Sequence, residues 1–257
     1  MNPGSRCWHP AATRKLRHIA ALAAGRFFSR PLPSRARTDP GHVRSGGRRS
    51  ASAYPDQVTV AYRIMYLLGF RPWERGGVDQ DLAQFLDSEE GARRPPYGQA
   101  LDLGCGTGLQ TVELARRGWD TVGIDNVPKA IDRARRRPAT GSVRFVLGEV
   151  TDLAGAELGA GFSLFVDRGC FHGLDDAQRG RVARDVTQLA TTDAVMLMFA
   201  FGAGAPRPLP RGAEPGDVAA ALTGWELTEV RELPLDGMPP PLRRRQVPGR
   251  WLRLQRR

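Results

Sequence analysis

Cysteine is scarce in this chain, whose 257 residues include three, at positions 7, 105 and 170. They lie far apart, and none has the spacing of a metal site or of a C-x-x-C motif, which argues against a disulfide framework and favours a reducing compartment. Long apolar runs are also missing, since none approaches the roughly 18 residues that cross a bilayer. We therefore expect a soluble, cytoplasmic protein without a metal ion.

Acidic residues are rare at both ends of the chain. Residues 1–53 hold eleven Lys and Arg against one acid, and residues 231–257 hold eight Arg against two acids, whereas residues 54–230 carry 19 basic and 24 acidic side chains. The formal net charge of +11 thus resides at the ends. Nucleic-acid binding through the body of the chain is disfavoured, although the basic termini leave phosphate or another polyanion open as a partner.

The first 53 residues are rich in Arg, Pro, Ser and Gly and show no sustained periodicity, which predicts a disordered basic extension before a domain over 54–257. Within them, Leu16–Phe28 is acid-free and bears arginine, as organelle-targeting peptides do. Targeting and a start codon assigned too far upstream remain alternatives. No feature of the sequence indicates an oligomeric state.

From Gly98 onward, apolar strands alternate with amphipathic helices. Before Gly98, the patterns predict helices at 60–69 and 78–89. After it, they predict strands at 99–103, 121–125, 143–147, 162–166, 194–201, 225–233 and 250–254, and helices at 109–117, 128–137, 175–190 and 216–222. Alternation of this kind is typical of an α/β domain with a doubly wound, mostly parallel sheet covered on both faces. We expect seven strands, of which the last two form an antiparallel hairpin at one edge.

The stretch Leu101–Gly108 reads Leu-Asp-Leu-Gly-Cys-Gly-Thr-Gly and predicts a tight strand-to-helix turn that lets a ligand approach the backbone. A dinucleotide site is one interpretation, and Asp125, 19 residues after Gly106, suits it. The G-x-G-x-x-G spacing, however, would need glycine at Leu109. Asp102 would repel a pyrophosphate and attract an ammonium group, so a ligand with a cationic end fits better.

Polar residues cluster where four predicted strands end: Asp102 with the glycines, Asp125, Glu149–Asp152 and Asp167–His172. Ligands of doubly wound sheets bind at the carboxyl ends of the strands, beside the switch in strand order. An isolated acid is usually an ordinary loop residue, but four clusters at one edge indicate a binding site.

These motifs resemble those of class I S-adenosylmethionine-dependent methyltransferases. Leu101–Gly108 is similar to the first motif of that superfamily, Val122–Asp125 to the second and Gly148–Leu153 to the third. Phe165–Leu174 resembles the fourth motif of the thiopurine and tellurite-resistance methyltransferase branch, and Pro72–Gly76 resembles its Pro-Trp motif. The resemblance covers about residues 58–257 and implies a Rossmann-like methyltransferase fold with S-adenosylmethionine as cofactor.

The resemblance also implies site residues. The cofactor-binding set is Asp102, Gly104, Cys105, Gly106, Gly108, Asp125, Asn126, Glu149, Val150 and Asp167. In this set the glycines admit the methionine and ribose portions, Asp125 accepts from the ribose hydroxyls, and Glu149 with Val150 meets the adenine edge. The family has aspartate more often than glutamate at that position, so Asp152 competes with Glu149. Both Cys105 and Cys170 flank the site, where small buried side chains are the better interpretation.

Methyl transfer requires alignment of donor and acceptor, and a general base only where the acceptor must lose a proton. Asp167 and His172 are the candidate catalytic residues, and Trp73, Arg168 and His172 the candidate substrate contacts, with structural roles as the alternative for each. Segments 202–212 and 234–241 are expected to shape the acceptor pocket.

No Asn-Pro-Pro-Tyr motif, no Pro-Cys nucleophile and no RNA-binding module is recognisable in the sequence. We therefore expect a small-molecule acceptor that is methylated on S, O or N. The alternative is a noncatalytic methyltransferase-like protein that binds a ligand or associates with RNA.

Overall fold

The computed structural model describes residues 79–205, 209–238 and 240–257. The predicted helix at 60–69, Trp73 and the basic extension over 1–53 lie outside the described residues. The boundary expected at residue 54 therefore stays a prediction.

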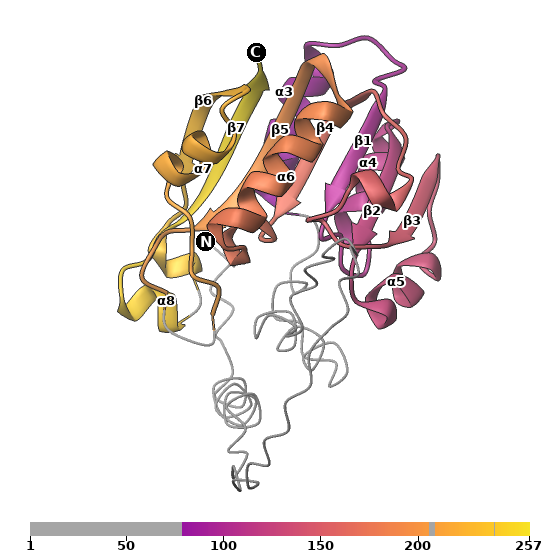
Figure 1. The fold of residues 1–257 in the computed structure, drawn as a ribbon. Coiled ribbons are helices and arrows are strands. Elements are labelled where there is room, and N and C mark those ends of the chain that lie inside the picture. The colour runs from indigo at the N-terminus through magenta and orange to yellow at the C-terminus, as the bar shows by residue number, and fades with distance from the viewer. Residues whose placement is uncertain (1–78, 206–208, 239) are drawn as a thin grey trace, which may run out of the picture. The chain divides into compact units, whose positions relative to one another are not determined.

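Seven strands form one sheet (Figure 1). They are β1 Gln99–Leu103, β2 Asp120–Asp125, β3 Val143–Leu147, β4 Phe162–Arg168, β5 Ala190–Phe201, β6 Trp225–Glu232 and β7 Gly249–Arg256. The α-helices of the described part are α3 Gln80–Gly91, α4 Leu109–Arg117, α5 Pro128–Arg135, α6 Asp176–Leu189, α7 Pro215–Ala221 and α8 Pro240–Arg244, and short 3-10 turns lie at η2 Ala154–Ala156, η3 Phe171–Gly173 and η4 Leu235–Gly237.

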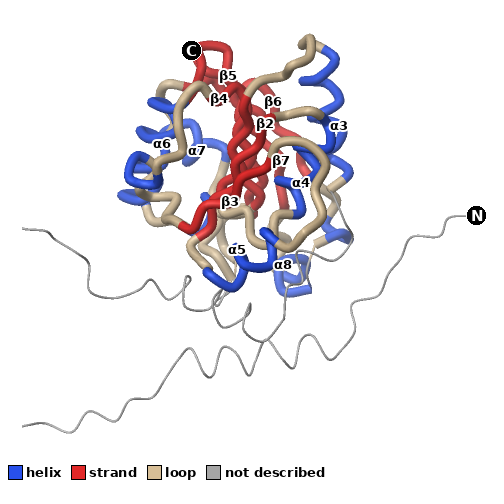
Figure 2. Tube along the Cα trace, turned by 90° about the vertical axis from the view of Figure 1, so that its right-hand side faces the viewer, coloured by secondary structure: helices blue, strands red, loops and turns tan. Residues whose placement is uncertain are grey.

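The strand order is β3-β2-β1-β4-β5-β7-β6. The first five strands run parallel, and β7 pairs antiparallel with both β5 and β6. This arrangement confirms the doubly wound, mostly parallel sheet with an antiparallel edge hairpin. In Figure 2, α3 and α4 cover one face of the sheet and α6 and α7 cover the other.

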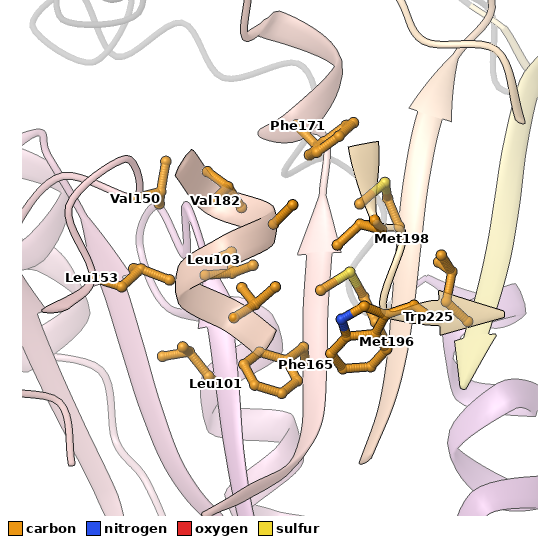
Figure 3. Packing of buried hydrophobic residues seen from close by; sticks show 14 of the residues in the cluster. Leu101, Leu103, Val150, Leu153, Phe165, Phe171, Val182, Met196, Met198 and Trp225 are labelled. Carbon is orange, nitrogen blue, oxygen red and sulfur yellow. The ribbon is translucent and has the colours of Figure 1, made fainter. Parts of the chain in front are cut away.

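Alternation along the strands builds a core on each face. In β4, Phe165 packs in the cluster on the α6 side with Met196 and Trp225, as Figure 3 shows. Its neighbours Leu164 and Val166 pack on the opposite side with α3. Each buried side chain of this size contributes about 1.5–3 kcal/mol, so the two cores hold the sheet rigid beneath its carboxyl edge.

The strand order reverses between β1 and β4, which places the topological switch point at their carboxyl ends. The register pairs Leu103 with Ile124 on one side and with Asp167 on the other. All three strands therefore end at one level, and the residues that follow them converge on the same crevice.

Most predicted bounds lie within two residues of the observed ones, and the structure differs further from the sequence-based expectation in two elements. β5 begins at Ala190, directly after α6, rather than at Ala194, because the hydrogen-bonded ladder extends past the apolar run to pair Ala190 with Phe162. α8 lies in a proline-rich stretch for which the sequence predicted no helix, and Leu242 packs there in a buried cluster with Met238. Within the described ranges, no helix is both long and apolar enough to cross a membrane.

Candidate functional site

The glycine loop after β1 requires glycine at its first and last positions, because a side chain at each would clash with a different neighbour. Gly104 has φ 67°, and a Cβ there would lie 2.9 Å from the Cβ of Cys170, which follows β4. Gly108 has φ 76°, and a Cβ there would lie 2.6 Å from the ring of Phe145 on β3. The loop thus follows a left-handed path through a space that a larger residue would block.

Asp125 at the end of β2 supports this loop. Its Oδ2 accepts the backbone N–H of Gly106 at 2.9 Å, and its Oδ1 accepts that of Val127 at 2.8 Å. Burial raises the pKa of this carboxyl. Because a carboxylate offers about four lone-pair sites, each oxygen keeps room for one further donor.

Asp102 lies one residue before the end of β1 and is 2 % exposed. The hydroxyl of Thr111 on α4 donates to its Oδ2 at 2.6 Å. Burial raises the pKa of Asp102 to about 7, and the charges of Asp167 and Asp125 add to the rise. Thr111 was not among the site residues predicted from the sequence, although a polar residue on the buried face of the following helix is a signal that could have identified it.

Two residues join the ends of β2 and β3. Asn126 donates from its side-chain amide to Glu149 Oε2 at 3.0 Å. Asp152, the competing candidate, accepts from the Gly155 backbone N–H within its own turn. Val150 is buried and packs in the α6-side core (Figure 3). Glu149, rather than Asp152, therefore lies beside the end of β2, where Asp125 supports the glycine loop.

Asp167 is the penultimate residue of β4, and its side chain binds the turn that leads into η3. Its carboxylate accepts three backbone N–H groups, from Gly169 at 3.0 Å, Cys170 at 2.8 Å and Phe171 at 2.9 Å. Burial nevertheless raises its pKa to about 6. With both oxygens engaged by the turn, this side chain orders the segment that flanks the glycine loop.

Arg168 follows Asp167 and lies on the rim of the site. Its Nη2 contacts Asp79 Oδ2 at 3.3 Å, and Asp79 is also the N-cap of α3. This ion pair ties the first described helix to the carboxyl end of β4, at the place where the sequence analysis expected a substrate contact.

His172 lies in η3 and is 2 % exposed. Its Nδ1 accepts the backbone N–H of Phe201 at 3.1 Å, and its ring stacks on Phe201 with centroids 4.8 Å apart. Burial lowers its pKa to about 3, so the ring is neutral over the whole working range of pH. Since the Nδ1 lone pair is occupied, His172 fastens η3 to the end of β5.

Arg179 of α6 is a further residue that the sequence analysis did not single out. It is 3 % exposed and donates to the carbonyl oxygens of Gly212 at 2.6 Å and Phe171 at 3.4 Å. The Gly212 N–H in turn donates to the His172 carbonyl at 3.1 Å. The loop after β5 is thereby anchored to η3, and its part in the acceptor pocket stays a prediction.

The two described thiols lie among carboxylates. Burial raises the pKa of Cys105 and Cys170 well above the ordinary value, and nearby aspartates add to the effect. In a Cys7→Ser background, we expect both thiols to react with a disulfide reagent at pH 8 at least about 10-fold more slowly than free cysteine, because the thiolate is the reactive form. Stopped-flow titration checks this, with denatured protein as the control. Reaction of either thiol at the free-cysteine rate would contradict the prediction.

The donor set suits a ligand that is cationic at one end and carries vicinal hydroxyls. Asp102, Asp125 and Asp167 are all buried with raised pKa values, so each is destabilised as an anion in the ligand-free site. A positive charge brought into the crevice would relieve that cost. Among the described residues, no group of three or more His, Cys, Asp or Glu side chains is arranged to hold a metal ion.

Comparison with known proteins agrees with this chemistry. A family model described as a methyltransferase domain matches residues 100–193, from β1 into β5. The 2-heptyl-1-hydroxyquinolin-4(1H)-one methyltransferase of Mycobacteroides abscessus is 27% identical over 145 residues, which cover 56% of this chain and 62% of that protein. This chain spans less than two thirds of the length of the curated relatives it matches.

Solved structures share the fold. The 1,6-didemethyltoxoflavin-N1-methyltransferase of Burkholderia thailandensis, which holds S-adenosylhomocysteine, superposes with a TM-score of 0.60 at 19% identity, over 81% of this chain and 93% of that one. A TehB-like methyltransferase of Corynebacterium glutamicum gives 0.56 at 23% identity, over 77% and 100%. The sheet order and these matches show that the chain has the fold of class I S-adenosylmethionine-dependent methyltransferases, and its residues 100–193 match a methyltransferase domain.

Proposed function

We propose that this protein transfers a methyl group from S-adenosylmethionine to a small molecule. The observation that carries the proposal is the group of buried carboxylates around the glycine loop. Asp102 is the main one: its side chain is 2 % exposed, and it precedes a loop whose backbone path requires glycine. A pyrophosphate ligand would be repelled there, whereas the ammonium and sulfonium groups of S-adenosylmethionine would be attracted.

We assign five residues of the crevice a part in holding this cofactor. Gly104 and Gly108 leave room for the methionine and ribose portions, Asp125 offers its remaining lone pairs to the ribose hydroxyls, and Glu149, held by Asn126, faces the adenine edge. Bound S-adenosylmethionine supplies an electrophilic methyl group on a sulfonium, which is transferred by in-line displacement.

The described residues contribute alignment rather than proton transfer. Asp167 has both oxygens engaged by the η3 turn, and His172 has its Nδ1 lone pair engaged by Phe201. His172 therefore lacks the free lone pair that a general base needs, whereas Asp167 keeps one lone pair on Oδ2 beside the N–H of Phe171. We assign both to positioning, because three backbone N–H groups hold Asp167 in the turn, and we expect an acceptor whose S, O or N atom is nucleophilic without their help. Alignment alone can supply up to about 7–11 kcal/mol of the barrier reduction.

The relatives favour a small-molecule acceptor. The Mycobacteroides abscessus protein acts on a quinolone, and the Burkholderia thailandensis structure contains 1,6-didemethyltoxoflavin. A place in the thiopurine and tellurite-resistance branch and a cytoplasmic location stay predictions, the second resting on the scarcity of cysteine.

Titration calorimetry with S-adenosylmethionine and S-adenosylhomocysteine tests cofactor binding. Absence of binding at near-millimolar cofactor would overturn the proposal. Turnover is tested by incubating the protein with methyl-labelled cofactor and either a metabolite extract or an RNA pool. Label in a small molecule supports the proposal, and label in RNA alone overturns the acceptor class. Binding without label in either pool would favour the noncatalytic alternative.

A further inference from the structure

Arg137 follows α5 and its C-cap residue Arg136, at the position where the sequence predicted the last residue of the helix. The turn after the helix places it, because its backbone N–H donates to the carbonyl of Ala134 at 2.9 Å. The adjacent Arg136 is the C-cap residue of α5 and is exposed. Arg137 is half-buried, so the two neighbouring arginines have different surroundings.

The guanidinium of Arg137 reaches the glycine loop 30 residues away. Its Nε donates to the Thr107 carbonyl at 3.0 Å, and its Nη2 donates to Thr107 Oγ1 at 3.1 Å. Thr107 is 3 % exposed and stands between the second and third glycines of the loop. The rigid fork of a guanidinium matches such a two-point contact, which an ammonium group would satisfy only at one point.

This contact holds one particular peptide unit. The Thr107 carbonyl accepts from Arg137, and the N–H of the same peptide unit, on Gly108, donates to the Cys105 carbonyl at 2.9 Å. Gly108 has φ 76°, and glycine has other backbone conformations within easy reach. Glycine at this position permits other orientations of the peptide unit, and the hydrogen bonds at its carbonyl and its N–H favour the observed one.

A flip would turn the carbonyl of Thr107 away from Arg137 and change the path of the loop that receives the cofactor. We propose that Arg137 is a positioning residue, which holds the glycine loop in its cofactor-binding conformation from the α5 side without touching the cofactor. This inference rests on the proposed function, because it assigns the loop to S-adenosylmethionine.

The test compares Arg137→Ala with Arg136→Ala, which removes the same charge one residue earlier without removing a contact to the loop. Titration calorimetry with S-adenosylhomocysteine is expected to show a dissociation constant about 10-fold higher for Arg137→Ala, which corresponds to about 1.4 kcal/mol. Arg136→Ala should stay within about 2-fold of the unaltered protein, and Arg137→Lys should recover part of the loss. The melting temperatures of the ligand-free variants should agree within a few degrees.

Thr107→Val provides a second route, because it removes the hydroxyl contact and keeps the shape of the side chain. We expect it to weaken binding by roughly 2–3-fold, and to add nothing in the Arg137→Ala background, since both changes break the same contact. This variant keeps the inference testable if Arg137→Ala does not fold.

The outcomes separate the inference from the function on which it rests. Equal binding by the unaltered protein and by Arg137→Ala overturns the positioning role alone. An equal loss in Arg136→Ala also overturns it, because the effect would then be one of overall charge. A lower melting temperature with unchanged affinity assigns Arg137 to stability only. If the unaltered protein binds no cofactor, the proposed function falls, and this inference falls with it.

Discussion

Replacing Asp125 by alanine is expected to weaken the binding of S-adenosylmethionine by at least about 100-fold. The carboxylate accepts the N–H groups of Gly106 and Val127. Under the proposed function, its remaining lone pairs accept the two ribose hydroxyls. Hydrogen bonds to a charged group contribute about 1.5–3 kcal/mol each, so the loss of two from the ligand exceeds a 100-fold change in affinity. Titration calorimetry measures the effect directly.

Asp132 provides the matched control for Asp125. It lies on α5 and is exposed, so Asp132→Ala removes a carboxylate from the same region without removing a contact to the loop. We expect its affinity to be unchanged. Binding by Asp125→Ala within about 3-fold of the unaltered protein would show that this acid does not hold the cofactor.

Replacing Asp102 by asparagine is expected to stabilise the ligand-free protein and to weaken cofactor binding. Burial raises the pKa of Asp102 from 3.8 to about 7. Between these values the folded state binds more protons than the unfolded state, so this group lowers the free energy of unfolding as pH rises from about 4 to about 7. The penalty reaches up to about 4 kcal/mol at pH 8. Asparagine removes it and still accepts the hydroxyl of Thr111.

Thermal unfolding of the two ligand-free proteins checks the stability effect. Asp102→Asn should melt several degrees higher at pH 8, and the difference should shrink as pH falls toward 4. A lower melting temperature for the variant at pH 8 would contradict the assignment of Asp102 as a buried anion that destabilises the ligand-free protein.

Calorimetry checks the binding effect of the same change. Ionisation of Asp102 and Asp167, whose pKa values are raised to about 7 and about 6, should strengthen binding of the cationic cofactor as pH rises from 5.5 to 8. The rise should be smaller for S-adenosylhomocysteine, which lacks the sulfonium charge, and smaller in Asp102→Asn. Equal pH dependence for both ligands would exclude charge selection by this crevice.

The bounds of the elements around the glycine loop, and the position of Asp125, could be predicted from local patterns in the sequence. The bounds predicted for β1 and α4, residues 99–103 and 109–117, agree with the structure, because buried apolar runs and glycines mark their ends. The acid at 125 also lies where the parallel register requires, one residue past the level of Leu103. Periodicity and turn chemistry act over a few residues, so a single sequence is enough to read them.

The candidate bases show what the sequence does not carry. Asp167 and His172 have residue types and positions suited to proton transfer, yet three backbone N–H groups of the following turn hold the Asp167 carboxylate, and the N–H of Phe201 occupies the Nδ1 lone pair of His172. The partner of His172 is 29 residues away, at the end of β5. Whether a polar atom is free or engaged depends on such distant neighbours, and so it appears only once the chain is packed.

The amino-acid sequence by itself determined the α/β architecture, the glycine loop and the acid at 125, because each follows from short-range patterns of apolar, glycine and charged residues. Tertiary structure alone decided that β7 lies between β5 and β6, that Thr111 bonds to Asp102, and that Arg137 holds Thr107. These features join segments through the geometry of packing, where a shift of one helical turn would remove the contact without altering any local pattern.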